Sequence, residues 1–298
     1  MLSILIPTFN QDISKLVNDL YLQAKESYTD FEIIVMEDGS HLYVAENKKI
    51  KQLDYCRHIE LNENIGRSAI RNKLADEAKY NHLLFIDCDA EVCTTHFVEK
   101  YLSFCKEECV VIGGTAYDEN EQNPAFSLRL KYGRIREARS AIQRSKHNTY
   151  HNFATFNFLI SKSLFNKVRF DETIRGYGHE DTLFGHQLHE LGCDFIQIEN
   201  PLIHRGLDNN ETFIHKTEEG TRNLYLLYQT GHYPFLIDES KLLHTFVKIR
   251  NWKLNSLFAL KFIFTKKILR WLLNRKSPSL LLYDLYKILF LCKLSIEK

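Results

Sequence analysis

Two carboxylates, Asp87 and Asp89, follow an apolar run at residues 83–86. The run is long enough for one buried strand, and ligands of open α/β sheets gather outside the carboxyl ends of the strands. Two acids that alternate along a nearly extended chain can share one hard cation, Mg²⁺ or Mn²⁺, through oxygen ligands. The alternative is a strand that ends in polar residues only to start a turn.

A second acidic pair, Glu180 and Asp181, stands at the expected start of a helix, after a loop with two glycines. A carboxylate at such a junction can act as a general base, since the backbone holds it while it faces a cleft. Acids are also common at helix N-termini for dipole reasons alone. His204 follows an expected edge strand near residues 197–203. A lone histidine is more often structural, unless a metal ion is already present.

Arg67 and Arg71 lie four residues apart at the start of a helix expected over residues 67–79, so they share one face. A helix N-terminus with two guanidinium groups suits a phosphate or an acidic cluster, although solvated surface arginines would show the same spacing. The sequence contains no glycine-rich dinucleotide motif, no Walker loop and no His-Glu-x-x-His pattern. A bound nucleotide would therefore need a cation on Asp87 and Asp89 to neutralise its diphosphate.

The elements that must position these residues follow an α/β pattern. Apolar runs at residues 2–6 and 31–36 predict two strands, and helical spacing between Ile13 and Ala24 predicts a helix that connects them. A strand, a helix and a strand in this order form a βαβ unit. If these strands run parallel, they end at the same edge as Asp87. We therefore expect a mixed sheet flanked by helices, with a helical appendage at the C-terminal end.

The chain of 298 residues suits one large domain with an appendage, and its apolar fraction of 44% supports a sizeable core. The first seven residues lack a basic leader and fit a strand, so no signal peptide is expected. Seven cysteines without paired ligand spacing favour reduced thiols in a cytosolic protein over a disulfide framework. The basic, irregular stretch 118–152 fits equally a mobile segment at the mouth of the site and a solvated helix.

The net charge of +1 conceals an uneven distribution. Residues 241–298 hold thirteen Lys and Arg and two acids, a net charge of +11, so the first 240 residues carry −10. This asymmetry predicts an anionic partner for the C-terminal part, either a membrane surface or nucleic acid. One expected C-terminal helix carries apolar residues on one face, namely Leu257, Leu260, Phe264, Ile268, Trp271 and Leu272. Such a helix is too charged to span a membrane; it can lie in the interface or pack as a lid on the main domain.

Five short motifs occur in order within residues 1–220, and together they resemble a family 2 glycosyltransferase of the GT-A fold. They are Ile6-Pro7-Thr8-Phe9-Asn10, Glu37-Asp38-Gly39-Ser40, Asn64-Ile65-Gly66-Arg67-Ser68-Ala69-Ile70-Arg71-Asn72, Asp87-Cys88-Asp89 and Gly178-His179-Glu180-Asp181. Each motif alone is weak, whereas five at these intervals are a strong signal. The resemblance implies a GT-A domain over residues 1–220 and a basic amphipathic helical region over residues 221–298.

The resemblance also implies a donor site for a nucleotide sugar. The residues that it assigns to this site are Pro7, Thr8, Asn10, Asp38, Arg67, Arg71 and Asp87. Of these, Thr8, Asn10 and Asp38 would hold the nucleobase and the ribose. Arg67 and Arg71 would border that part of the site.

For the metal, the resemblance implies that Asp89 is the direct ligand of Mn²⁺ or Mg²⁺, with Asp87 nearer the ribose, and that His204 completes the metal shell. Members of this family invert the anomeric centre in one displacement, with Asp181 here as the base and Glu180 orienting the acceptor. The chemistry agrees with these roles. The acceptor hydroxyl must lose its proton as it attacks, and the charge that develops on the nucleoside diphosphate needs stabilisation.

The function so implied is the inverting, metal-dependent transfer of a sugar to a glycan or a lipid-linked acceptor in cell-surface polysaccharide synthesis. UDP is the favoured nucleotide by family habit, with GDP and dTDP open. The enzyme would be cytoplasmic and peripheral on the anionic inner face of the cell membrane, without a nucleic-acid partner. Two alternatives are a sugar-phosphate nucleotidyltransferase, whose usual glycine- and basic-rich loop is not seen at residues 7–12, and a non-catalytic nucleotide- or glycan-binding module.

Overall fold

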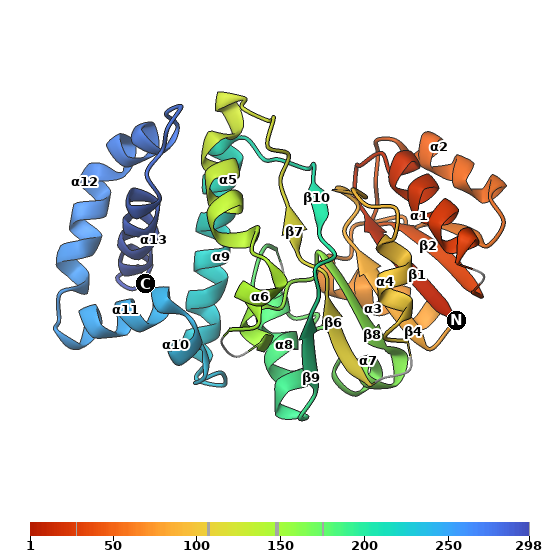
Figure 1. Cartoon of the computed structure of the whole chain (residues 1–298). Helices are drawn as coiled ribbons and strands as arrows, with labels where there is room; N and C mark the ends of the chain where they lie inside the picture. Colours follow the sequence, from red (N-terminus) through yellow and green to blue (C-terminus); the bar gives the residue numbers. More distant parts are fainter. Residues whose placement is uncertain (28, 106–107, 147–148, 175, 298) are drawn as a thin grey trace. The chain divides into compact units, whose positions relative to one another are not determined.

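The structure is a computed structural model that describes residues 1–27, 29–105, 108–146, 149–174 and 176–297 (Figure 1). The chain divides into two compact units. The first, here called the sheet unit, comprises Met1–Asp118, Glu137–Arg175 and Glu180–Gly206. The second, here called the helical unit, comprises Glu119–Arg136, Gly176–His179 and Leu207–Lys298. Arg175 and Lys298 themselves lie outside the described residues.

A seven-stranded sheet forms the framework of the sheet unit. In sheet order its strands are β3 (Cys56–Glu60), β2 (Phe31–Glu37), β1 (Leu2–Thr8), β4 (His82–Ile86), β8 (Asn157–Ser161), β6 (Cys109–Ile112) and β9 (Asp194–Gln197). The first four strands run parallel, whereas β8 runs antiparallel to both β4 and β6. The expected mixed sheet is therefore confirmed, and β1, β2 and β4 end at one edge.

A second sheet has three short strands, in the order β5 (Ala90–Glu91), β10 (Leu202–His204) and β7 (Thr115–Ala116). β10 runs antiparallel to β5 and parallel to β7. The expected edge strand near residues 197–203 is divided in the structure. Gln197 ends β9, which is the edge strand of the large sheet, whereas Leu202–His204 form β10, the central strand of the small sheet. Its two neighbours are only two residues long, and strands so short have no periodicity that a sequence could reveal.

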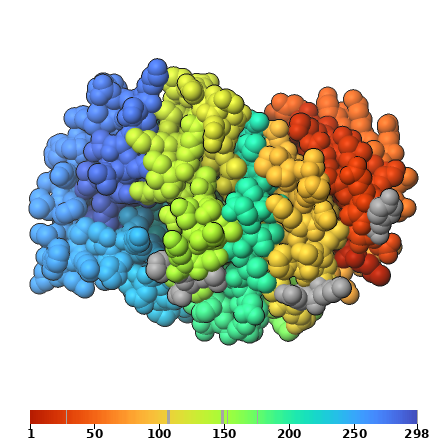
Figure 2. Space-filling model, viewed as in Figure 1, coloured from red at the N-terminus to blue at the C-terminus, as the bar shows by residue number. Residues whose placement is uncertain are grey.

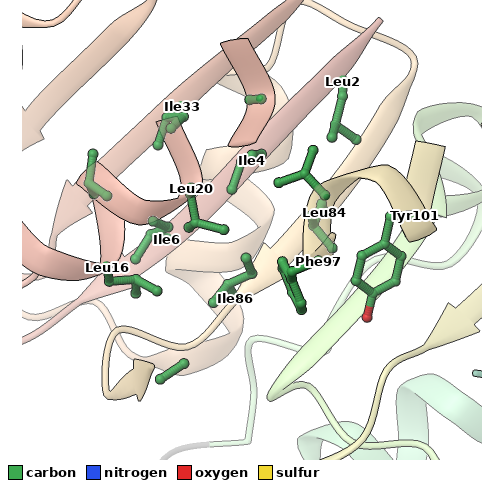
Figure 3. Close-up of a cluster of buried hydrophobic side chains, with 14 of the residues drawn as sticks. Leu2, Ile4, Ile6, Leu16, Leu20, Ile33, Leu84, Ile86, Phe97 and Tyr101 are labelled. Atoms are coloured by element: carbon green, nitrogen blue, oxygen red, sulfur yellow. The ribbon is translucent and has the colours of Figure 1, made fainter. Parts of the chain in front are cut away.

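Two helices, α1 (Ser14–Glu26) and α4 (Phe97–Leu102), cover one face of the large sheet. Strand residues such as Ile4 and Leu84 alternate with residues of the other face, as the two-residue period of a strand requires. They pack against Leu16, Leu20 and Phe97 of these helices (Figure 3). This contact fixes α1, the crossover helix of the βαβ unit that the sequence predicts, on the sheet.

Three helices, α3 (Arg67–Glu77), α7 (Lys162–Val168) and α8 (Glu180–Glu190), cover the opposite face. The core on this side is rich in phenylalanine, and Phe184 of α8 stacks on Phe170 with ring centroids 4.1 Å apart. Asn72 of α3 holds this region, because its side chain hydrogen-bonds both the backbone nitrogen and the backbone oxygen of Phe170. The start of α8 is thereby placed beside α3.

The helical unit consists of helices that pack on one another. Its α-helices are α5 (Ser127–Tyr132), α9 (Asn210–Thr230), α10 (Leu236–Glu239), α11 (Lys241–Asn251), α12 (Asn255–Leu273) and α13 (Leu280–Leu294). In Figure 1, α13 lies between α9 and α12 and contacts both. The boundary expected at residue 220 falls inside α9, and this helix belongs whole to the helical unit. Among the described residues, no helix is both long and apolar enough to cross a bilayer.

The remaining helices are short: α2 (Val44–Asn47), α6 (Ala141–Arg144), the 3-10 helices η1 (Lys48–Gln52), η2 (Pro124–Phe126) and η4 (Thr149–Asn152), and the π-helix η3 (Gly133–Glu137). Several of them lie in the basic stretch 118–152. Leu128 and Arg144 in this stretch are buried, so a solvated helix does not describe it. Residues 147 and 148 of the stretch lie outside the described residues. All seven cysteines are free thiols, as expected.

Candidate active site

The loops that follow β1 and β2 are joined at Asn10. This residue has a φ of 52°, in the left-handed region that asparagine tolerates better than most residues. Its side-chain oxygen accepts hydrogen bonds from the backbone nitrogens of His41 (2.8 Å) and Leu42 (3.0 Å). The backbone nitrogen of Asn10 donates to Ser40 Oγ. Asn10 therefore shapes the rim of the site through both loops. Phe9, beside it, is 49% exposed at this rim.

Glu37 forms a buried hydrogen-bond centre beneath this rim. Its carboxylate accepts from Ser40 Oγ (2.6 Å) and Asn47 Nδ2 (2.8 Å), and Oε1 lies 3.2 Å from His58 Nε2. Burial opposes ionisation here, yet the hydrogen bonds from His58, Ser40 and Asn47 lower the pKa of Glu37 below its usual range. A buried carboxylate thus connects the ends of β2 and β3, although the sequence singled out only its neighbour Asp38.

Asp38 holds the loop in front of α3. Its two oxygens accept from the backbone nitrogens of Ile65 (2.7 Å) and Gly66 (3.2 Å), and burial raises its pKa. Gly39 makes the close approach of the two loops feasible, since a Cβ there would lie 2.6 Å from Asn64 N. The buried Thr8 hydroxyl donates to Ile6 O, and Pro7 and Thr8 are part of β1 rather than of the loop after it.

The two arginines of α3 occupy different environments. Arg71 is only 2% exposed, and its guanidinium donates to Asp87 Oδ1 at 2.6 Å. It also donates to the carbonyl oxygen of Arg67, one turn earlier. Arg67 is half exposed, and its guanidinium lies 3.8 Å from the carboxylate of Glu180. The buried ion pair excludes the possibility that both are solvated surface residues, and α3 connects the end of β4 to the start of α8.

Asp89 faces a different partner from Asp87. Its Oδ2 lies 3.2 Å from His204 Nε2, and this bond lowers the pKa of Asp89 although burial acts in the opposite sense. The small sheet creates the pair, because its register places His204 opposite Ala90. Gly206 completes the packing, since any Cβ there would overlap the Asp89 carboxylate.

The side chains of Asp89 and His204 decide whether a divalent cation fits at this place. No cluster of three or more His, Cys, Asp or Glu side chains that could hold a metal is present in the described part of the chain. His204 Nε2 is the ring nitrogen that faces the Asp89 carboxylate. The other ring nitrogen, Nδ1, is buried and has no hydrogen-bond partner among the described residues. One carboxylate and one imidazole fit a cation whose other ligands come from a phosphate and water, and the imidazole favours Mn²⁺ over the harder Mg²⁺.

Glu180 and Asp181 begin α8, where the helix dipole favours negative charge. The core holds this first turn in place through Leu183 and Phe184, both almost fully buried. Burial, followed by the charge of Glu180, raises the pKa of Asp181 to about 6. A carboxylate with this pKa is suited to general-base catalysis near neutral pH, because it can be ionised and still accept a proton readily.

The structure therefore connects one member of each predicted acidic pair to α3, Asp87 through Arg71 and Glu180 through Arg67. Glu37, Gly206 and the aromatic ring of Phe9 are the main residues whose part in the site the sequence did not indicate. Phe9 and Glu37 each belong to one of the five motifs, but the resemblance assigned no task to either. For Gly206 no signal existed, since its contact with Asp89 depends on the small sheet.

The parallel strands, the antiparallel β8 and the acidic strand end define a GT-A glycosyltransferase fold, and solved structures confirm this class. A mannosyltransferase from Pyrobaculum calidifontis, in complex with GDP-Man and Mn²⁺, matches with a TM-score of 0.59 over 99% of this chain and 88% of its own, at 11% identity. S. aureus TarS 1-349 in complex with UDP-GlcNAc matches with a TM-score of 0.52 over 99% and 91%, at 16% identity.

The chain belongs to glycosyl transferase family 2, whose model matches residues 3–169. Two curated relatives are chondroitin synthases. That of Escherichia coli is 25% identical over 68% of this chain, and that of Pasteurella multocida is 27% identical over 68%. The matched part of this chain spans only 34% of the length of the E. coli relative and 24% of that of the P. multocida relative.

The raised pKa of Asp181 predicts a pH-dependent gain in stability for Asp181→Asn. Ionised Asp181 costs free energy in the folded state, so the variant should be more stable by about 1–2 kcal/mol near pH 7.5, an estimate reduced for partial solvent exposure. The gain should disappear as the pH falls toward about 4, where the folded wild type is protonated. Urea unfolding at several pH values measures this difference.

The matched control is Asp54→Asn, at an exposed aspartate far from α8 in sequence. The effect of this control on the free energy of unfolding should vary less with pH than that of Asp181→Asn. If Asp181→Asn behaved like this control, the charge of Asp181 would carry no folding cost, and the environment described for it would be wrong.

Proposed function

We propose that the chain is an inverting, metal-dependent glycosyltransferase that moves a sugar from a nucleoside diphosphate to a hydroxyl of a glycan or lipid-linked acceptor. The observation that carries this proposal is the placement of Asp181. Its pKa is raised to about 6, and Glu180 beside it contacts the same helix, α3, that binds Asp87 through Arg71. The acidic pair that contains the base and the acidic pair on the donor side therefore both contact one rigid element, helix α3.

In the proposed reaction, the acceptor oxygen attacks the anomeric carbon while the bond from that carbon to the diphosphate oxygen breaks. The hydroxyl proton passes to a carboxylate oxygen of Asp181, which is worth about 10²–10⁴ in rate. Glu180, held near the guanidinium of Arg67, orients the acceptor. One displacement from the opposite side inverts the anomeric configuration, so no covalent sugar–enzyme intermediate forms.

The donor side is assigned to the rim of the sheet. The Asn10 and Asp38 loops form the nucleobase and ribose end, with Thr8 beneath them and the exposed ring of Phe9 available to stack on a base. Asp87 stays on Arg71 and lies toward the ribose. Pro7 contributes by fixing the end of β1.

Asp89 and His204 would hold the divalent cation, Mn²⁺ by preference, with Asp87 as the neighbouring acid. When bound, this cation supplies Lewis-acid stabilisation of the negative charge on the nucleoside diphosphate. Gly206 and the small sheet hold the two ligands in place. Because the charge of the leaving group is stabilised in this way, the site needs no general acid.

Two further observations support the proposed class of acceptor and the proposed location of the enzyme. Both curated relatives are chondroitin synthases, which favours a glycan acceptor in polysaccharide synthesis. Residues 241–298 carry a net charge of +11, which favours peripheral attachment to the anionic cytoplasmic face of the cell membrane over a freely diffusing enzyme. A UDP-sugar is the donor we propose; the GDP-Man and UDP-GlcNAc of the structural neighbours keep more than one nucleotide in the test.

Calorimetric titration with UDP, GDP, CDP and dTDP, each with and without Mn²⁺, tests the donor site. We expect one nucleotide, UDP, to bind in the micromolar range, roughly tenfold or more weakly without the metal. No binding of any nucleotide to folded protein in the presence of Mn²⁺ would contradict the proposal and leave the glycan-binding module as the better reading.

Single substitutions separate the base from the metal ligand. Asp181→Asn should keep metal-dependent UDP binding within about twofold and lower the transfer rate by about 10²-fold or more. Asp89→Asn should abolish the metal dependence of nucleotide binding, because it removes the charged ligand. Nucleotide titration and release of UDP from the sugar donor measure the two effects. The reverse pattern would exchange the two roles, and normal transfer by both variants would exclude this catalytic site.

A further inference from the structure

The outer face of α12 is apolar although it is exposed. Five large residues recur at the helical intervals i, i+3, i+7, i+11 and i+14, and their exposed fractions run from 50% to 74%. They are Leu257, Leu260, Phe264, Ile268 and Trp271, here called the α12 face. The opposite side of the helix is the packed one, since Phe262 contacts Tyr286 and Phe290 of α13. Figure 2 shows the blue C-terminal helices at the surface of the molecule.

The charges that α12 itself carries are all of one sign. The helix has four basic residues and no acidic one. Lys266 and Arg270 pair with Glu218 on the packed side, whereas Lys261 and Lys267 lie on the two borders of the α12 face and form no ion pair within the described residues. Arg275 lies over the ring of Trp271, with 4.9 Å to its centroid. An apolar stripe with an aromatic end and basic borders is suited to the interface of an anionic bilayer.

We propose that the α12 face is the membrane-docking surface of this protein and that its occupant is an anionic lipid surface. The packing of the helical unit leaves these five side chains exposed, so they are available to a partner. If a second copy of the chain bound through the same face, Lys261 and Lys267 of the two copies would come close together and repel one another. A bilayer that contains anionic lipid accepts both the apolar side chains and the positive charge. This inference specifies the membrane contact of the proposed function.

The two tryptophans of the chain offer a direct probe, since both belong to this region. Trp271 is on the α12 face, and Trp252, 69% exposed, lies shortly before the helix begins. We expect the tryptophan emission of the full chain to shift to the blue with phosphatidylcholine vesicles that contain roughly one third phosphatidylglycerol, and not with phosphatidylcholine alone. Added salt should weaken the binding.

The test variant is Phe264→Ser with Ile268→Ser, which leaves the charge unchanged. It should bind anionic vesicles at least about tenfold more weakly. The matched control is Leu22→Ser with Leu226→Ser, which changes one leucine on α1 and one on α9. These two leucines are 50% and 52% exposed, and the control should bind vesicles like the wild type. Equal vesicle binding by all three proteins would overturn the proposal. So would a wild-type dimer in sedimentation without lipid that the test variant converts to monomer. Nucleotide binding should be the same in all three, so the donor site is judged separately.

A second inference concerns the segment Gly176–His179, which precedes Glu180. This segment belongs to the helical unit and packs on α9. Asn223 Nδ2 donates to Tyr177 O at 3.1 Å. Gly178 approaches Gly220 so closely that a Cβ on Gly178 would lie 3.3 Å from the Gly220 Cα.

The backbone of this segment is tightly specified. Gly176, Gly178 and His179 have φ values of 84°, 96° and 76°. For a histidine this conformation is unfavourable, and it persists only where the surroundings impose it. α9 supplies such surroundings on one face, with Glu219 against Gly176 and Lys216 5.7 Å from the centroid of the Tyr177 ring.

We infer that Gly220 and Asn223 are positioning residues for the base, because the segment that they hold leads directly into Glu180 and Asp181. This inference rests on the proposed function. A Cβ on Gly220 would lie 3.5 Å from Tyr177 O, an ordinary contact, so Gly220→Ala should be tolerated. The larger side chain of Gly220→Val should displace the segment, and Asn223→Ala should release it.

Kinetics with the nucleotide sugar whose nucleotide binds tightest test this inference. Gly220→Val should lower kcat by about tenfold or more and keep the affinity for the nucleotide within about twofold. Asn223→Ala should act in the same direction. Gly220→Ala and the exposed Gln229→Val on the same helix should behave as the wild type. An unchanged kcat, or an equal loss of nucleotide affinity, would overturn the positioning role. A wild type without transfer activity would instead refute the proposed function.

Discussion

The ion pair between Arg71 and Asp87 is the interaction on which the site depends. A guanidinium that is almost fully buried is tolerated only with a carboxylate partner, and removal of either member would leave an uncompensated charge. The pair fixes α3 against the end of β4. One turn earlier on the same helix, Arg67 reaches Glu180, so the position of the second acidic pair follows from the first. A helix with two arginines thus relates the position of Asp87 to that of Glu180, which we propose as the donor side and the base side of the site.

Around this pair, each carboxylate of the site has a different environment, and the difference defines its chemistry. Glu37 and Asp89 are held by hydrogen-bond donors that lower their pKa values against the effect of burial. Asp181 has fewer such donors and a neighbouring negative charge, so its pKa is raised to about 6. Carboxylates that stay ionised can bind cations or order loops, whereas one that titrates near neutrality can exchange a proton. The sheet edge therefore contains both kinds within one structure.

The helical unit contributes in two separate ways to the proposed enzyme. Its α9 holds the segment before the base, and its α12 presents apolar side chains bordered by lysines. In our proposal, the first contact positions the base, and the second brings the enzyme to the membrane where it meets the acceptor. Since the basic charge is concentrated in residues 241–298, binding to a lipid surface need not disturb the acidic site residues of the sheet unit.

The sequence by itself determined the α/β class, the order of the motifs and the candidate residues Asp87, Asp89, Glu180 and Asp181. An apolar run that ends in acids and a glycine loop that leads into an acidic helix start are both local features. The sequence also revealed the α12 face, since helical spacing is a local period. Only the tertiary structure decided that His204 meets Asp89, which requires the central strand of a sheet whose neighbours have two residues each. It likewise separated buried Arg71 from half-exposed Arg67, showed that Glu37 is a buried centre, and placed α9 whole in the helical unit. Those facts depend on which distant segments pack together, and residue spacing along a chain does not encode such contacts.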